Sequence, residues 1–291
     1  MPGTNLIAAH LDHRRSHAEF NYVYPVISRR SRGVSIGVNL NPDKKCNFDC
    51  IYCEVDHMAT PRSQNVDIDQ LGQELRAILQ SYEDGSLFAR EPFASVPKAW
   101  RRLNDIAFSG EGEPTTCPLF EEAVKEVVDV RELLGLDTVK LILITNAAGL
   151  RLPNVQRGIR RMQEGAHEIW AKLDAGTTEA YRAINRTRVP YSRILKNITI
   201  TACWCPLFIQ SLFLRRDGKP PGDDEIFAYA DRLIEIGVRG GKILGLQLYT
   251  LARPAPTNRV TALSDDELNR IAAMIHKRTG LPCGLFYGNP S

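Results

Sequence analysis

Three cysteines lie within eight residues of one another, in the segment CNFDCIYC that runs from Cys46 through Cys50 to Cys53. Thiolates are soft ligands that bind iron–sulfur clusters, zinc or copper(I). A structural zinc site takes four ligands, usually as two separated pairs, and no C-x-x-C pair follows downstream. A cubane cluster held by three cysteines keeps one iron with an open coordination position. The spacing favours an iron–sulfur cluster, and the alternative is a non-catalytic zinc-binding module that uses the same loop.

An aromatic residue, Tyr52, directly precedes the last cysteine of the loop. C-x-x-x-C-x-x-C with an aromatic residue at this position resembles the fingerprint of the radical S-adenosylmethionine (SAM) superfamily. The resemblance implies one 4Fe–4S cluster on Cys46, Cys50 and Cys53, whose open iron chelates the amino and carboxylate groups of SAM beside Tyr52. It also implies reductive cleavage of SAM to methionine and a 5′-deoxyadenosyl radical that acts on a substrate. The chain is then an Fe–S enzyme of the oxidoreductase or lyase type, with a reductant such as flavodoxin or ferredoxin as partner.

The segment SGEGEPT, after the second expected strand, resembles the G-G-E-P element of the same family, with Gly112, Glu113 and Pro114 at the matching positions. In the family this backbone accepts the ammonium group of the methionine part of SAM, so Gly112 and Glu113 are predicted to bind the cofactor. Glu111 stands where many members have glycine. Which of the two carboxylates faces SAM is therefore open.

Two further strand ends resemble family elements. Thr-Asn-Ala at 145–147 is similar to a T-N-G turn, which makes Asn146 a predicted SAM contact; the alternative is an asparagine that tolerates a left-handed turn. The segment KLDAG is similar to an S-L-D segment and makes Asp174 a further predicted cofactor residue. Lys172 replaces the expected small polar residue, and three roles are open for it. It binds the SAM carboxylate, anchors an anionic substrate or pairs with Asp174.

The order SGxGEPT, TN, LDAG and Y-T-x-A-R-P more narrowly resembles uncharacterised Fe–S oxidoreductases grouped with wyosine-tRNA synthesis enzymes. The wyosine enzymes carry further N-terminal cysteines, and this chain has none before Cys46. The resemblance favours RNA as the substrate. Arginines at expected strand ends and in the N-terminal segment would supply phosphate contacts, and the alternative is that they are solvated surface residues; they are Arg215, Arg216 and Arg253, and Arg14, Arg15, Arg29, Arg30 and Arg32. The net charge of only +3 argues against RNA.

Short β-branched runs alternate with amphipathic stretches along the chain, which indicates parallel βα units. Strands are expected at 33–40, 105–109, 139–145, 167–173, 206–214 and 242–250, with a short edge strand at 283–286. Helices are expected at 67–81, 118–134, 153–164, 177–184, 192–200, 223–236 and 264–279. The fold class is therefore α/β, a partial (β/α)6 TIM-like barrel at 33–291, preceded by an irregular N-terminal extension at 1–32. Because barrel active sites lie at the C-terminal ends of strands, the polar residues named above are expected at one end.

The composition, with 43% hydrophobic and 24% charged residues, is that of a soluble globular protein. No run of about 18 apolar residues is present, and the first residues lack the apolar stretch of a signal peptide. A cytoplasmic protein without a membrane partner is therefore expected, in which cysteines stay reduced. The cysteines outside the loop stand in apolar stretches and are expected to pack as small hydrophobic residues, so one cluster per chain is predicted; they are Cys117, Cys203, Cys205 and Cys283.

Overall fold

The computed structural model describes residues 20–28 and 32–288. They divide into two compact units. The first holds the described residues of Met1–Lys45, His57–Leu143 and Pro153–Glu168. The second holds those of Cys46–Asp56, Ile144–Leu152 and Ile169–Ser291. The three cysteines of the loop therefore belong to the second unit, and the glycine-rich turn belongs to the first. The predicted domain boundary at residue 33 stays a prediction.

Eight strands form one sheet in the order β1-β2-β3-β4-β5-β6-β8-β10, among the residues that the structure describes. Strands β4 and β5 each contribute residues to both units. Neighbouring strands are parallel in the pairs β2/β3, β3/β4, β5/β6, β6/β8 and β8/β10. Parallel strands in chain order with helical connections are the topology of a partial (β/α)6 barrel, so the predicted fold class is confirmed. The strands of this sheet are β1 (Val23–Ser28), β2 (Gly33–Val38), β3 (Leu103–Phe108), β4 (Lys140–Thr145), β5 (His167–Lys172), β6 (Leu207–Leu212), β8 (Ile243–Tyr249) and β10 (Cys283–Phe286).

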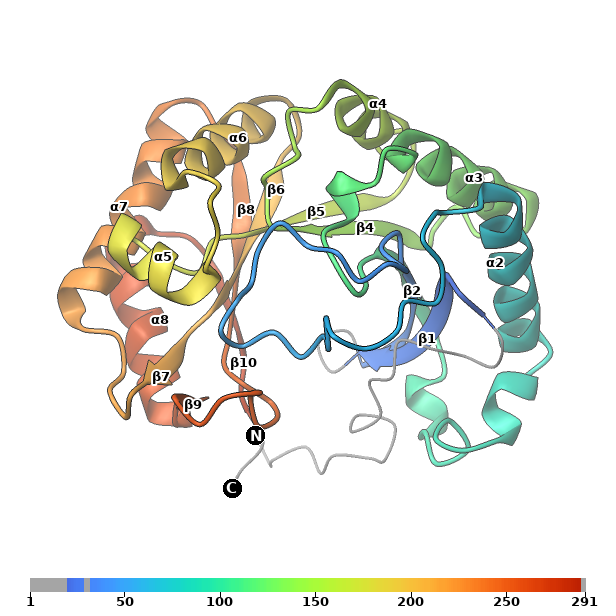
Figure 1. The fold of residues 1–291 in the computed structure, drawn as a ribbon, viewed down its shortest axis with the longest axis horizontal. Helices are drawn as coiled ribbons and strands as arrows, with labels where there is room; N and C mark the ends of the chain where they lie inside the picture. The colour runs from blue at the N-terminus through green and yellow to red at the C-terminus, as the bar shows by residue number, and fades with distance from the viewer. Residues whose placement is uncertain (1–19, 29–31, 289–291) are drawn as a thin grey trace. The chain divides into compact units, whose positions relative to one another are not determined.

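In the first unit, helices α2 (Ile68–Glu83), α3 (Phe120–Leu133) and α4 (Pro153–Met162) lie side by side (Figure 1). All six residues of β2 are buried, as expected for a parallel strand that is covered on both faces. The ring of Phe108 on β3 packs 5.8 Å from that of Phe120 on α3. Short 3-10 helices at Ser86–Ala89, Lys98–Trp100 and Pro114–Thr116 complete this unit.

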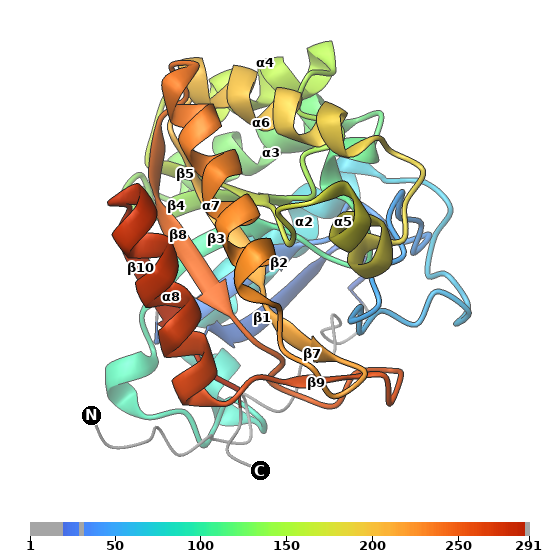
Figure 2. The ribbon, with the colours of Figure 1, turned by 90° about the vertical axis from the view of Figure 1, so that its left-hand side faces the viewer.

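In the second unit, helices α7 (Asp223–Val238) and α8 (Asp265–Thr279) run parallel to each other and are joined by the ion pairs Asp223–Arg270 and Asp231–Arg278. Helix α8 also packs beside β8 and β10 (Figure 2). Helix α8 begins at a capping box, in which Ser264 and Glu267 exchange hydrogen bonds, and ends at Gly280 in a left-handed conformation. Helices α5 (Thr178–Asn185) and α6 (Tyr191–Trp204) together connect β5 to β6. The expected helices are therefore present, with ends that differ by a few residues.

Two expectations about strands are wrong. Val23–Ser28 forms β1, antiparallel to β2, within the segment expected to be irregular. Pro25 lacks the amide hydrogen of a central strand, but β1 is at the edge of the sheet, where proline is tolerated. The strand expected at 206–214 ends at Leu212, and a separate strand β7 (Leu214–Arg216) pairs with β9 (Val260–Ala262). Residues 1–19 and 29–31 of the expected extension lie outside the described residues.

Candidate functional site

The cysteine loop is tied to the end of helix α5 through its backbone. The amide of Asp49 donates to the carbonyl of Asn185 at 3.2 Å, and the amide of Ile51 donates to that of Ile184 at 2.8 Å. The last carbonyls of a helix have no partner within the helix, so the loop satisfies them. Thr187 Oγ1 also donates to the carbonyl of Asn47 at 2.7 Å. These contacts attach the loop to α5 and to the segment that follows α5.

The three cysteine sulfurs are suited to an iron–sulfur cluster. Each cysteine is partly exposed and none forms a disulfide. The amide of Phe48 donates to Cys46 Sγ at 3.4 Å, and Asn185 Nδ2 donates to Cys50 Sγ at 3.4 Å. Hydrogen bonds to the sulfurs are a usual way for proteins to tune such clusters. The donor set and its surroundings therefore fit the predicted cofactor.

No group of three Cys, His, Asp or Glu side chains is placed to hold a single metal ion within the described part of the chain. In a cubane each cysteine binds a different iron, so the three cysteine sulfurs lie farther apart than the ligands of a single metal ion. Burial, followed by the negative charge of Asp174, raises the pKa of the Cys50 thiol to about 11. Metal binding must therefore displace a proton from Cys50 at neutral pH.

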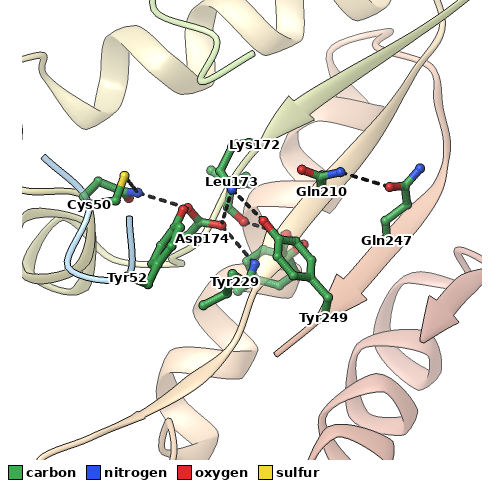
Figure 3. Close-up of polar contacts among 12 residues, drawn as sticks. Cys50, Tyr52, Lys172, Leu173, Asp174, Gln210, Tyr229, Gln247 and Tyr249 are labelled. Carbon is green, nitrogen blue, oxygen red and sulfur yellow. Dashed lines mark hydrogen bonds and ion pairs between the residues drawn. The ribbon is translucent and has the colours of Figure 1, made fainter. Parts of the chain in front are cut away.

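Asp174, two residues after the end of β5, is a buried acceptor for several groups of the second unit (Figure 3). Tyr52 donates its hydroxyl to Asp174 Oδ2 at 2.5 Å, and Asn185 Nδ2 donates to the same oxygen at 3.0 Å. The amide of Leu212 donates to Asp174 Oδ1 at 2.9 Å. Burial, followed by the charge of Asp174, raises the pKa of Tyr52 well above its usual range. Asp174 therefore joins the cysteine loop to the ends of β5, α5 and β6.

Lys172 lies between two tyrosine rings and faces Asp174. Its Nζ is 4.0 Å from Asp174 Oδ1 and donates to the hydroxyl of Tyr249 at 2.6 Å. The ammonium group also lies 5.0 Å from the ring centre of Tyr52 and 5.3 Å from that of Tyr249. Burial opposes the charge, but Asp174 and Tyr249 outweigh it and raise the pKa of Lys172 above its usual value. Of the three roles left open, pairing with Asp174 is the one present in the structure.

The two candidate glutamates of the glycine-rich turn, in the first unit, have different hydrogen-bond and ion-pair partners. Asn39 donates to Glu111 Oε2 at 3.1 Å, and Lys44 Nζ lies 3.8 Å from Glu111 Oε1. Glu113 Oε1 accepts from the amide of Thr115 at 3.2 Å and from its hydroxyl at 2.5 Å. Both glutamates are buried. Glu111 is paired with the cation Lys44, and the assignment of Glu113 to SAM stays a prediction.

Gly112 is packed too closely to accept a side chain. A Cβ there would lie 2.2 Å from the carbonyl oxygen of Lys45 and 2.7 Å from Cβ and Cγ of Asn41. We expect Gly112→Ala to lower the free energy of unfolding by about 1–3 kcal/mol, measured by denaturant unfolding. The control is Gly237→Ala in α7, where a Cβ meets nothing within 4 Å and alanine is the better helix former. Equal destabilisation by both changes would contradict this account.

Asn146 joins the end of β4 to the cysteine loop. Its Nδ2 donates to Asn47 Oδ1 at 2.7 Å, and its Oδ1 accepts from the amide of Ala148 at 3.0 Å. The residue in the left-handed conformation is Ala147, with φ 68°, where the T-N-G turn has its glycine. The alternative of a left-handed asparagine is therefore wrong. SAM contacts by Asn146, Asp174 and Tyr52 stay predictions.

No protein-family model matches the chain. GTPase Obg of Brachyspira hyodysenteriae is 22% identical over 252 residues, which cover 84% of this chain and 32% of that protein. A UPF0026 protein of Helicobacter pylori is 26% identical over 175 residues, which cover 60% of this chain and 48% of that protein. The chain thus spans less than half the length of these relatives. The GTP-binding pattern G-x-x-x-x-G-K-[ST] requires Ser or Thr directly after a Gly-Lys pair. In this chain the two Gly-Lys pairs are followed by Pro220 and Ile243, so the sequence lacks the pattern.

Solved structures match over most of the chain. A radical SAM methyltransferase from Sphaerobacter thermophilus has a TM-score of 0.62 and 14% identity, with 92% of this chain and 70% of that chain covered. The chain has the fold of a radical SAM enzyme. TYW1 with a lysine–pyruvate adduct bound has a TM-score of 0.54 and 16% identity, with 84% of this chain and 73% of that chain covered. The predicted resemblance to the radical SAM superfamily is thus confirmed at the level of the fold.

Two of the arginines expected to face a substrate in this radical SAM fold are paired with carboxylates. Arg215 contacts both carboxylate oxygens of Glu267, at 2.6 and 3.2 Å, and Arg253 forms an ion pair with Glu54. Arg216 is exposed, and the extension arginines before Arg32 lie outside the described residues. RNA as substrate stays a prediction, with fewer unpaired cations than expected. None of the helices described is long and apolar enough to span a membrane.

The asparagines that contact the cysteine loop and the glycine-rich turn were not singled out from the sequence. Asn185 contacts Cys50 and Asp174, Asn47 contacts Asn146, and Asn39 contacts Glu111. Asparagine is common in turns, where its side chain bonds to nearby backbone. The partners here lie up to 135 residues away, so no local pattern indicates them.

Proposed function

We propose that this protein is a radical SAM enzyme that binds a 4Fe–4S cluster through Cys46, Cys50 and Cys53. The observation that carries the proposal is a three-cysteine loop, with hydrogen-bond donors on two of its sulfurs, in a chain with the radical SAM fold. When bound, the cluster supplies the electron for reductive cleavage of SAM. Flavodoxin or ferredoxin is the proposed electron donor.

The residues around the loop hold it in place. Asn185 donates to Cys50 Sγ, and Tyr52 donates to Asp174. The part of the loop from Cys50 to Tyr52 is therefore attached to buried side chains. Lys172, whose Nζ lies 4.0 Å from Asp174 Oδ1, balances the charge of Asp174. In the first unit, Glu113 presents a buried carboxylate suited to a cationic ligand group. We assign this group to the ammonium of SAM.

Anaerobic reconstitution with iron and sulfide tests the proposal. We expect about four irons per chain and a broad absorption near ~400 nm, because thiolate-to-iron charge transfer absorbs there. SAM should change the EPR spectrum of the reduced protein and yield 5′-deoxyadenosine. A colourless protein that retains zinc through the same procedure would instead support the zinc-binding module.

Glu113→Ala should weaken SAM binding without loss of the cluster. Glu113 lies in the first unit and the cysteine ligands lie in the second, so iron content and SAM affinity are expected to separate. Loss of one charge-assisted hydrogen bond predicts a Kd for SAM raised by about tenfold or more, measured by equilibrium dialysis. The matched comparison is Glu111→Ala. If Glu111→Ala gives the larger loss of affinity, the assignment of the two glutamates is reversed.

A further inference from the structure

Asn41 has a buried side-chain oxygen without a hydrogen bond. It follows β2 in the first unit, and the residue is 5% exposed. Its Nδ2 donates to Thr116 Oγ1 at 3.2 Å, and its amide donates to Asn39 Oδ1 at 3.0 Å. No described residue donates to Asn41 Oδ1. A buried acceptor in this state is rare in native proteins, because burial has removed its hydrogen bonds to water.

The orientation of the amide is determined by its neighbour. Thr116 Oγ1 donates its single hydrogen to the carbonyl of Glu113 at 2.7 Å, so towards Asn41 it acts only as an acceptor. The nitrogen of Asn41 must therefore face Thr116. A flipped amide would place two acceptors together. The oxygen is consequently the atom left without a partner.

Asn41 packs against the glycine-rich turn, which also carries an acceptor. The side chain of Asn41 lies against Gly112, where a Cβ would be only 2.7 Å from Asn41 Cγ. The next residue, Glu113, is 3% exposed and carries a carboxylate, which accepts hydrogen bonds. A ligand group that serves both Asn41 Oδ1 and the Glu113 carboxylate offers hydrogen-bond donors to the first and a positive charge to the second. An ammonium group has both properties.

We propose that Asn41 Oδ1 accepts a hydrogen bond from the ammonium group of SAM, in the same site as Glu113. The inference rests on the proposed function and adds to it a binding residue from the segment that follows β2. It accounts for the orphaned oxygen, since the ligand supplies the donor that the chain lacks. It also explains why Gly112 has no side chain, because a Cβ would displace the Asn41 amide.

The test compares two ligands on the reconstituted protein, with binding measured by equilibrium dialysis rather than by turnover. The ligands are SAM and a sulfonium analogue in which hydrogen replaces the amino group. Asn41→Ala should raise the Kd for SAM by about tenfold and leave the Kd for the analogue unchanged. Asn41→Asp retains an oxygen at the position and should keep its preference for SAM over the analogue.

Four results would overturn or replace the inference. Equal SAM affinity of Asn41→Ala and the parent would mean that water, not the ligand, satisfies the oxygen. Parallel losses for both ligands would mean that Asn41 only shapes the turn. A parent protein that holds the cluster but binds no SAM would contradict the proposed function itself. Should Asn41→Ala fold poorly in thermal unfolding, Asn41→Asp decides, and loss of its preference for SAM over the analogue refutes the contact.

Discussion

Cys50→Ala is expected to lower the iron bound after anaerobic reconstitution from about four atoms per chain to almost none. Cys50 is the central thiol of the loop, and only three cysteines are predicted to hold the cluster. With one of them replaced, two thiolates remain for a cofactor that has no further protein ligand. The absorption near ~400 nm should be lost together with the iron.

The matched control is Cys205→Ala. Cys205 follows α6, is completely buried and lies outside the loop, and its pKa is raised to about 11 by burial. It is expected to act as a small hydrophobic residue, so its replacement should leave about four irons per chain. Iron binding by Cys50→Ala that equals the parent would refute the ligand assignment. Near-doubled iron in the parent, lost on changing Cys203 and Cys205, would instead show a second cluster.

Lys172→Met is expected to lower the free energy of unfolding by about 3 kcal/mol, because it leaves the buried charge of Asp174 without its cation. The Asp174 side chain has no exposed surface, whereas that of Lys172 is 19% exposed. The hydrogen bonds that Asp174 accepts from Tyr52 and Leu212 remain, which keeps the loss at the lower end of the usual range. Denaturant unfolding of the metal-free protein measures it.

Lys140→Met is the matched control for this change. The Lys140 side chain is 53% exposed and forms an ion pair with Glu168 at 2.5 Å. Ion pairs in contact with water contribute about 0–1 kcal/mol, so this control should change stability little. Similar losses of stability in the two variants would show that the fold does not need Lys172 to compensate the buried charge of Asp174.

The pH dependence of the Lys172 effect follows from the direction of its pKa shift. Folding raises the pKa of Lys172 above its usual value of 10.5, so the folded protein binds this proton more tightly than the unfolded chain. Its stabilising contribution is complete below pH 10.5 and is lost as the pH rises through the folded pKa. The difference between the parent and Lys172→Met should therefore stay constant between about pH 6 and 9.

The sequence by itself determined the features that depend on residues close together in the chain. The spacing of Cys46, Cys50 and Cys53 predicts the ligand set, because three donors within one loop need no distant partner to be recognised. The alternation of apolar periods predicts the order of the parallel strands, and the pair Ser264 and Glu267 predicts the start of α8. Each of these signals is local, since helix caps and strand periods involve neighbours a few residues apart.

Only the tertiary structure decided the roles of the polar residues around the loop. Lys172 meets Tyr249 across 77 residues, Asn185 meets Cys50 across 135, and Arg215 meets Glu267 across 52. The sequence shows a lysine, an asparagine and an arginine at these positions but not the partner that satisfies each of them. Strand β1 was missed for the same reason, since its edge position depends on pairing with β2. Burial and pairing are properties of the folded chain, because they follow from which distant segments exclude water from a side chain.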